Sequence, residues 1–219
     1  MRKPLVIIPA LNEERHLPKL LPRVPKKYDV LVVDDGSTDK TYEISKKAGV
    51  KVIRHAKNRG TGASLRDGFN YAIAHGYASC IVVNADLQHP PELIDGFMKE
   101  LDGFDAVIGS RFLGNDQLEM PLLRRAGNKF FTLLVNLLYG TCYTDVTCGM
   151  RAFKVSVLPK VLSGEERYGV EIDMSIKLRR FKVKEKPVPV IYAPNTSKMN
   201  LLRAWFQLAR PVVSNLFSF

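Results

Sequence analysis

Short apolar runs separated by helical stretches dominate the first half of the chain. Several of the runs consist of consecutive Val, Ile and Leu residues, as at 5–8 and 30–33, and such runs predict buried strands. The expected strands are 5–8, 30–33, 51–54, 81–83 and 106–109. Helices are expected between them at 41–48, 63–75 and 90–101. Strands and helices that alternate at this spacing predict an α/β fold with a mostly parallel sheet and right-handed crossovers.

The second half has a different texture. A helix is expected over 122–139, basic at its start and then almost entirely apolar. Its apolar part is too short to span a bilayer. Two interpretations stay open: a core helix, or a helix lying at a membrane interface with its cations at the headgroups. A further helix is expected at 171–180, and Pro189 marks 188–192 as an edge strand.

The last segment, 200–219, carries apolar residues at helical spacing. Pro211 is expected to kink or break that helix. The basic residues nearby favour contact with an anionic membrane, while packing against the rest of the chain explains the same pattern equally well.

The net charge of the chain restricts its possible binding partners only partly. The chain has 33 Lys and Arg against 22 Asp and Glu, a net charge of +11 that points to an anionic partner. Nucleic acid, a membrane surface and phosphorylated substrates all fit this charge. The three cysteines lack zinc-ligand spacing, and a reduced, cytosolic state is expected. We expect neither a secretory signal nor a transmembrane helix.

Polar residues follow the strand at 81–83. Asn84, Asp86 and Gln88 offer the oxygen ligands that Mg²⁺ or Mn²⁺ prefers. Alone, such a cluster is more often a turn than a site. Polar clusters also follow the strands at 5–8, 30–33 and 106–109, however, and carboxyl ends of parallel strands meet at one edge of a sheet. The recurrence favours a functional site there.

Several motifs together resemble family 2 glycosyltransferases of the GT-A type, in particular the dolichyl- or polyprenyl-phosphate mannose and glucose synthases. The motifs are PALNE (9–13), DDGS-x-D (34–39), N-x-G-x-G (58–62), NADLQHPPE (84–92), GSR (109–111), D-x-T-x-G-x-R (145–151) and SKM (197–199). The resemblance implies a GT-A, Rossmann-like fold. It predicts a catalytic domain over 1–199, with a nucleotide-sugar half at 1–115 and an acceptor half at 116–199, followed by an amphipathic tail at 200–219.

The resemblance also implies residue roles. The donor nucleotide pocket would comprise Pro9, Leu11, Glu13, Val33, Asp35, Asn84 and Ala85. Asp86 and Gln88 would hold the metal on the diphosphate, and Asp86 and Arg111 are the expected catalytic residues, Arg111 reaching the phosphates. The acceptor phosphate is expected to meet Arg124, Arg125 and Lys198. Asp34 and Asp39 are expected to stabilise turns, and Asn58, Gly60 and Gly62 to shape the floor of the site.

The chain departs from the family pattern at three positions. Asn84 replaces the first acid of the D-x-D motif, so it contacts either the metal or only the ribose or phosphate. Leu11 stands where an aromatic residue is usual. Tyr192 stands where the mannose synthases carry an arginine.

The function that the resemblance implies is inverting, divalent-metal-dependent transfer of mannose or glucose from a nucleotide-diphosphate sugar to dolichyl or polyprenyl phosphate. GDP-mannose is the favoured donor and UDP-glucose the alternative. A phosphate acceptor is already anionic and needs no general base. The enzyme is expected to be cytoplasmic and peripheral on the cytoplasmic face of the membrane, docked by amphipathic segments or by a separate anchoring subunit.

Two other functions are compatible with parts of the sequence. A GT-A enzyme acting on a saccharide or another hydroxyl would need a carboxylate general base. A basic adaptor for nucleic acid or membranes would account for the charge. The chain has no stacking-platform or groove-reading motif, so nucleic acid is not expected as a partner.

Overall fold

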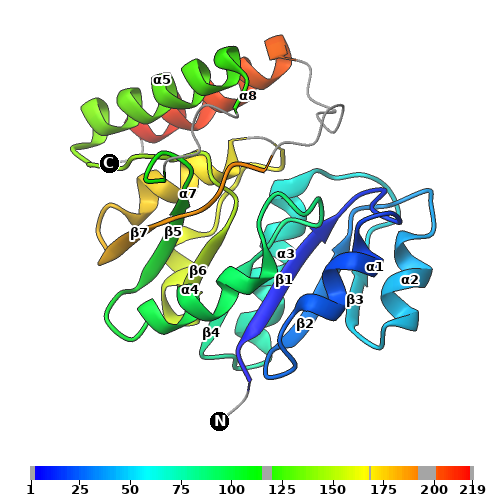
Figure 1. Cartoon of the computed structure of the whole chain (residues 1–219). Coiled ribbons are helices and arrows are strands. Elements are labelled where there is room, and N and C mark those ends of the chain that lie inside the picture. The colour runs from blue at the N-terminus through cyan, green and yellow to red at the C-terminus, as the bar shows by residue number, and fades with distance from the viewer. Residues whose placement is uncertain (1–2, 115–119, 168, 192–200, 218–219) are drawn as a thin grey trace.

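The computed structural model describes residues 3–114, 120–167, 169–191 and 201–217, and it contains one seven-stranded sheet (Figure 1). The strand order is β3-β2-β1-β4-β6-β5-β7. The strands are β1 (Leu5–Ala10), β2 (Asp29–Asp34), β3 (Lys51–Arg54), β4 (Ser79–Val82), β5 (Ala106–Ser110), β6 (Arg151–Lys154) and β7 (Val183–Pro187). Neighbouring strands pair in parallel except at β6, which is antiparallel to both β4 and β5. The expected α/β fold with a mostly parallel sheet is confirmed.

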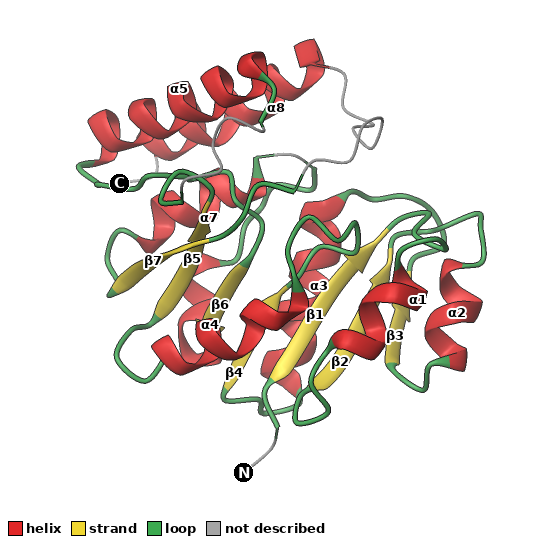
Figure 2. Ribbon diagram, viewed as in Figure 1, coloured by secondary structure: helices red, strands yellow, loops and turns green. Residues whose placement is uncertain are grey.

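Helices cover both faces of this sheet (Figure 2). The helices among the described residues are α1 (Leu17–Leu20), α2 (Thr41–Lys47), α3 (Thr61–Ala74), α4 (Ile94–Glu100), α5 (Leu122–Tyr139), α6 (Leu158–Val161), α7 (Val170–Leu178) and α8 (Leu201–Ser214). Of these, α5 and α8 pack with α7 at one end of the molecule and do not lie on a face of the sheet (Figure 2). One core joins the sheet to α3, α6 and α7, and a second core joins the opposite face to α1 and α4. In β1, Leu5 and Ile7 belong to the first core while Val6 and Ile8 belong to the second. Burial on both faces explains the continuous apolar runs of these strands.

The last strand lies earlier in the sequence than expected. The predicted strand at 188–192 is wrong: β7 occupies 183–187 and pairs in parallel with β5, from Ala106 with Val183 to Ser110 with Pro187. Its lysines suit an edge strand, because charged side chains discourage pairing with another chain. Pro189 has no N–H to extend the ladder, and only the Val188 N–H still bonds to the Ser110 carbonyl (3.0 Å). Tyr192 lies outside the described residues.

The tail packs against the domain. α5, α7 and α8 share a third apolar cluster that includes Phe131, Ile172 and Val212. The Tyr139 hydroxyl donates a hydrogen bond to the Val212 carbonyl, and the Asn215 amide donates one to Asp173 (2.7 Å). These contacts show that the inner face of α8 is an intramolecular packing face.

The helix of the tail runs through its proline. A kink or a break was expected at Pro211, and the helix does not break there, since α8 continues to Ser214. Proline leaves the carbonyl of Gln207 without its usual intrahelical donor. That carbonyl lies against Gly169, where even a Cβ atom would come within 2.5 Å of it. Packing against α7 thus holds the helix together at the point where local sequence would end it.

No helix among the described residues is long and apolar enough to cross a bilayer.

Candidate active site

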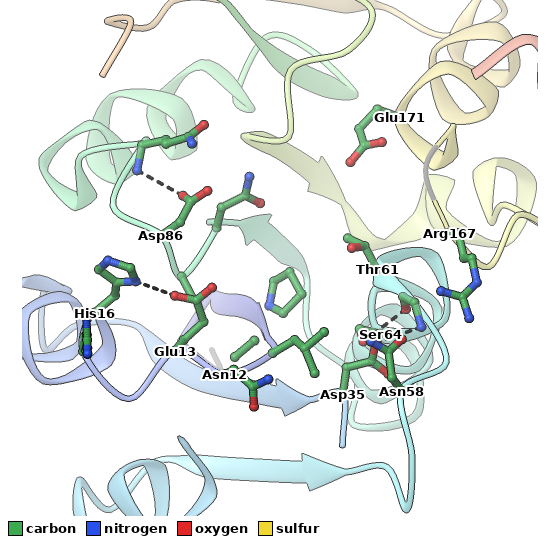
Figure 3. A pocket seen from close by; sticks show the side chains of 18 of the residues that line it. Asn12, Glu13, His16, Asp35, Asn58, Thr61, Ser64, Asp86, Arg167 and Glu171 are labelled. Carbon is green, nitrogen blue, oxygen red and sulfur yellow. Dashed lines mark hydrogen bonds and ion pairs between the residues drawn. The ribbon is translucent and has the colours of Figure 1, made fainter. Parts of the chain in front are cut away.

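A cleft of about 620 Å³ opens where β1, β2 and β4 end (Figure 3). The order in which the chain adds strands to the sheet reverses here, because the parallel strand β1 pairs with β2 on one side and with β4 on the other. Such a switch point is where α/β sheets bind ligands. The side chains and backbone that line the cleft come from Pro9, Ala10, Leu11, Asn12, Glu13, Arg15, His16, Asp35, Asn58, Gly60, Thr61, Ser64, Asn84, Ala85, Asp86, Gln88, Arg124, Arg167 and Glu171.

The loop after β1 is fixed by the turn after β2. The N–H of Asn12, at φ +57°, donates to the Ser37 hydroxyl (2.9 Å), and the N–H of Glu13 donates to the Thr41 hydroxyl (2.7 Å). That turn is itself held by Asp34, which accepts from the Ser37 N–H (2.9 Å). Asp39 accepts from the backbone of residues 14 and 41. The expected turn-stabilising role of both aspartates is confirmed, and it presents residues 9–13 along the cleft.

Asp35 lies at the floor of the cleft and is buried. Its carboxylate accepts hydrogen bonds from the backbone N–H groups of Arg59 and Gly60, each at 2.8 Å, and contacts Nδ1 of His55 at 2.7 Å. A carboxylate offers about four acceptor positions. Three are occupied, which leaves Asp35 with one acceptor position for a ligand.

The glycine-rich turn shapes the floor because another loop lies against it. A Cβ atom on Gly60 would lie 2.3 Å from the Glu166 carbonyl oxygen, and one on Gly62 would lie 2.1 Å from that of Glu165. The Ala63 N–H donates to the Glu166 carbonyl (3.2 Å). This backbone donor near the start of α3 is therefore engaged within the protein.

Asp86 follows β4 and is largely buried at the cleft wall. The Gln88 N–H donates to its carboxylate (3.1 Å), and Leu87 between them has φ +61°. Burial raises the pKa of the Asp86 carboxyl above its usual range, although that backbone bond and the charges of His16 and Arg124 oppose the shift. The fold thus keeps a desolvated carboxylate facing a cleft, which favours a cation as its partner.

Asn84 lies beside Asp86 with its side chain against Gly149. A Cβ atom at Gly149 would come within 2.9 Å of the Asn84 amide nitrogen. Ala85 is buried between them and adds little surface to the cleft. The amide of Asn84 is thus held in place next to the carboxylate by backbone contact.

The cationic residues expected at the site are dispersed. Arg124, in the first turn of α5, lines the cleft, whereas Arg125 does not. Lys198 lies outside the described residues.

Val33, expected in the nucleotide pocket, is fully buried in the core between β2 and α3 and presents no side-chain surface to the cleft.

Arg111 faces a second, small cavity beside the main cleft, together with Gln88 and His89. Its guanidinium forms a bidentate pair with Asp145 (2.7 and 2.9 Å) and donates to the Thr147 hydroxyl (2.7 Å). Burial alone would raise the pKa of Asp145, but Arg111 holds it below its usual range. Arg111 is separated from Asp86 because β6 lies between β4 and β5 in the sheet.

Five lining residues lie outside the expected motifs and site residues: Arg15, His16, Ser64, Arg167 and Glu171. Nδ1 of His16 contacts the Glu13 carboxylate at 2.5 Å, near Asp86. Glu171, at the start of α7, faces the cleft from the side opposite Asp86, and burial raises its pKa (Figure 3). His16 follows the PALNE motif by a few residues and was a detectable candidate. Arg167 and Glu171 belong to no motif that points to this cleft.

Known proteins share both the sequence pattern and the fold. The family model of glycosyl transferase family 2 matches residues 5–162. The polyprenol monophosphomannose synthase of Mycolicibacterium smegmatis is 30% identical over 228 residues, which cover 95% of this chain and 86% of that protein. The UDP-N-acetylglucosamine–dolichyl-phosphate N-acetylglucosaminyltransferase of Methanococcus voltae is 31% identical over 214 residues, 85% of each chain.

Among solved structures, glucosyl-3-phosphoglycerate synthase of Mycobacterium tuberculosis, in complex with Mn²⁺, UDP and glucosyl-3-phosphoglycerate, superposes with a TM-score of 0.75. It is 21% identical in sequence, and the match covers 97% of this chain and 79% of that one. At this identity the likeness establishes the GT-A fold.

Proposed function

The chain belongs to glycosyl transferase family 2, and on that premise we propose that it transfers a hexose from a nucleotide-diphosphate sugar to a polyprenyl or dolichyl phosphate. The observation that carries the proposal is the cleft at the ends of β1, β2 and β4. It brings Asp35, Asp86, Gln88 and Arg124 to one surface. A nucleotide, a diphosphate and an anionic acceptor each find a chemical counterpart among these residues.

The residues at Asp86 fit a divalent cation shared with the substrate. Among the residues that the structure describes, no group of three or more His, Cys, Asp or Glu side chains is arranged to hold a metal unaided. Mg²⁺ often binds through one or two carboxylates plus substrate phosphates. The desolvated Asp86 carboxylate and the Gln88 amide suit that arrangement, with Asn84 adjacent. The cation would act as a Lewis acid on the departing nucleoside diphosphate.

The acceptor phosphate supplies the nucleophile. Its oxygen forms a bond to the sugar C1 from the face opposite the diphosphate, the bond from C1 to the diphosphate oxygen breaks, and the configuration inverts. The phosphate is already ionised, so no proton has to be removed. The protein's task is to hold two anions together, for which we assign Arg124 at the cleft, Arg111 beside it, and Arg125 and Lys198.

The donor is proposed to lie along Pro9, Leu11 and Glu13, with its base or ribose at Asp35. We favour GDP-mannose because a mannose synthase is among the relatives. Another relative is named for UDP-N-acetylglucosamine, so UDP-sugars belong in the test.

We further propose that the enzyme works at the cytoplasmic face of a membrane, which it reaches through α5 and α8. The outer face of α5 exposes Leu122, Leu133 and Leu137 at 71%, 58% and 73%. This helix carries Arg and Lys but no Asp or Glu. An apolar face beside cations matches the lipid–headgroup boundary. A separate anchoring subunit is the alternative route to the membrane.

One observation favours a second candidate function. Glu171 faces the cleft and burial raises its pKa, which are the properties of a general base. A hydroxyl acceptor such as a saccharide would use it. With such an acceptor, Glu171→Gln should lower kcat steeply, whereas with a phosphate acceptor the same variant should retain transfer.

The proposal is tested by incubating the protein with GDP-mannose or UDP-glucose, polyprenyl phosphate in vesicles, and Mg²⁺ or Mn²⁺. We expect formation of a polyprenyl-phosphate sugar that EDTA abolishes. The matched control is Asp95→Asn, which removes a surface carboxylate paired with Lys27 and should leave transfer unchanged. Failure to transfer sugar from any common nucleotide sugar would refute the proposal.

A further inference from the structure

A buried histidine lies directly behind the floor of the cleft. His55 follows β3, and its side chain is 4% exposed. Its Nδ1 lies 2.7 Å from Oδ1 of Asp35, and its Nε2 lies 2.9 Å from Oδ2 of Asp67 on α3. The imidazole therefore bridges the end of β2 to the middle of α3.

Both partners of this ring are carboxylate oxygens, which accept hydrogen bonds when ionised. A neutral imidazole has one N–H and one lone pair, so it would place that lone pair against a carboxylate oxygen in a buried site. Such a contact leaves two acceptors facing each other without a proton. When both carboxylates are ionised, both contacts are hydrogen bonds only if each ring nitrogen carries a hydrogen, which is the imidazolium cation.

The other donors to the two carboxylates support this assignment. Asp35 also accepts two backbone N–H groups, and Asp67 also accepts from the Arg59 guanidinium (2.9 Å). Donors of this kind stabilise the ionised carboxylates. With His55 protonated, two anions and two cations balance. The adjacent Asp34 has its own cationic partner, Arg54, at 3.3 Å.

The second buried histidine gives a contrast within the same chain. His89 contacts the Cys148 thiol (3.6 Å) and no carboxylate, and burial with the nearby Arg111 charge lowers its pKa to about 4. The two rings are similarly buried, but we expect opposite charge states, because of the two only His55 faces carboxylates.

We propose that His55 is a positioning residue which, as an imidazolium, ties Asp35 to Asp67 and so sets the nucleotide floor of the cleft. Asp35 holds the turn at Arg59 and Gly60 that leads to Thr61, a lining residue. His55 itself does not line the cleft. Without a hydrogen on both ring nitrogens, one of the two contacts of His55 is weakened, and the turn at Arg59 and Gly60 is held less firmly. This role rests on the proposed function only in that the floor is taken as the nucleotide site.

The charge state is tested by NMR of the protein labelled with ¹⁵N in its four histidines. At about pH 7.5 we expect imidazolium-type shifts at both nitrogens of His55 and a neutral ring at His89. His55→Gln identifies the His55 signals. In Asp67→Asn, which keeps the shape but removes one anion, the His55 signals should move toward those of a neutral ring at that pH. A neutral His55 near pH 7.5 in the wild type would overturn the proposal.

The positioning role is tested by calorimetric binding of GDP and UDP with Mn²⁺ at about pH 7.5. Asp67→Asn should weaken binding, because it removes one of the two carboxylates that hold the ring. His55→Gln should weaken binding roughly tenfold, about one hydrogen bond to a charged group. The matched control is Asp29→Asn, a half-exposed aspartate at the opposite end of β2 that contacts Lys51 and Tyr77. It should leave nucleotide affinity unchanged.

The possible failures are distinguishable. If nucleotides bind but Asp67→Asn binds them as tightly as the wild type does, the positioning role is wrong while the proposed function stands. If neither nucleotide binds the wild type, the proposed function and the floor both fail, and the NMR experiment still decides the charge of His55.

Discussion

Asp86 lowers the stability of the fold at neutral pH. Burial raises its pKa, so the folded protein disfavours its ionised form. Below the ordinary value of 3.8 the group is neutral in both the folded and the unfolded chain. As pH rises, the unfolded chain ionises first, and the free energy of unfolding decreases.

We therefore expect Asp86→Asn to raise the melting temperature of the metal-free protein at neutral pH and to leave it unchanged well below pH 3.8. The same variant should lower kcat roughly 100-fold or more, the usual scale for losing a charged group at a reacting centre. Thermal unfolding at several pH values and a transfer assay measure the two effects. A variant that is both less stable and fully active would contradict the assigned role.

The pKa shift of Asp145 has the opposite sign to that of Asp86. Arg111 outweighs the burial penalty and lowers its pKa, so the pair stabilises the fold above pH 3.8, and that stabilisation is lost as pH falls through the depressed folded-state value. Asp145→Asn should cost about 3–5 kcal/mol near neutral pH, because it leaves the Arg111 charge buried without its partner. Urea unfolding should show this difference shrinking under acid. The exposed pair Lys27–Asp95 is the control, and Asp95→Asn should change stability little.

At the scale of single elements, the glycine-rich start of α3 couples two loops. A Cβ atom at Gly62 would overlap the Glu165 carbonyl, which is backbone and cannot rotate away. We expect Gly62→Ala to destabilise the protein by about 1–3 kcal/mol, as overpacking does, and to raise the KM for the nucleotide sugar. Gly103→Ala, where a Cβ atom meets nothing within 4 Å, should be nearly neutral in both measurements. Equal effects at the two sites would refute the close-approach argument.

The elements also show where local pattern suffices. The strands β1, β2, β3 and β5 lie within two residues of their predicted bounds, and α5 occupies 122–139 as expected. Most of these elements have a strong apolar pattern, whereas β3 has only Val52 and Ile53 between two charged residues. β7 was missed because Lys184 and Lys186 interrupt its apolar pattern. A kink or a break was expected at Pro211, but α8 continues to Ser214 in contact with α7. Such edge and packing effects depend on neighbours that are distant in sequence.

At the scale of the whole molecule, α5 and α8 lie side by side across one end (Figure 1). The start of α5 contributes Arg124 to the cleft. An enzyme that acts on a lipid phosphate would gain from this arrangement, because the helix joins the site to an apolar surface.

Replacing Leu133 and Leu137 with Gln should therefore reduce binding to anionic vesicles by roughly tenfold or more, since each exposed leucine offers about 1.5–3 kcal/mol on full burial. Folding should be unaffected, as both side chains are already exposed. Vesicle flotation and thermal unfolding measure the two outcomes. The control is Ile73→Gln on α3, an exposed apolar residue outside α5 and α8. If the double variant still floats with vesicles, α5 is not the docking face.

The sequence by itself determined the order of buried strands, the polar residues at their carboxyl ends and the family. These properties follow from local periodicity and motif spacing, which can be recognised within a single segment of the chain. Which polar residues meet was decided only by the tertiary structure. The antiparallel β6 lies between β4, which precedes Asp86, and β5, which precedes Arg111, and Arg111 pairs with Asp145. Glu171 reaches the cleft from α7, and His55 finds two carboxylates on different elements. Contacts between distant segments follow from strand order and helix packing, and no single stretch of sequence records them.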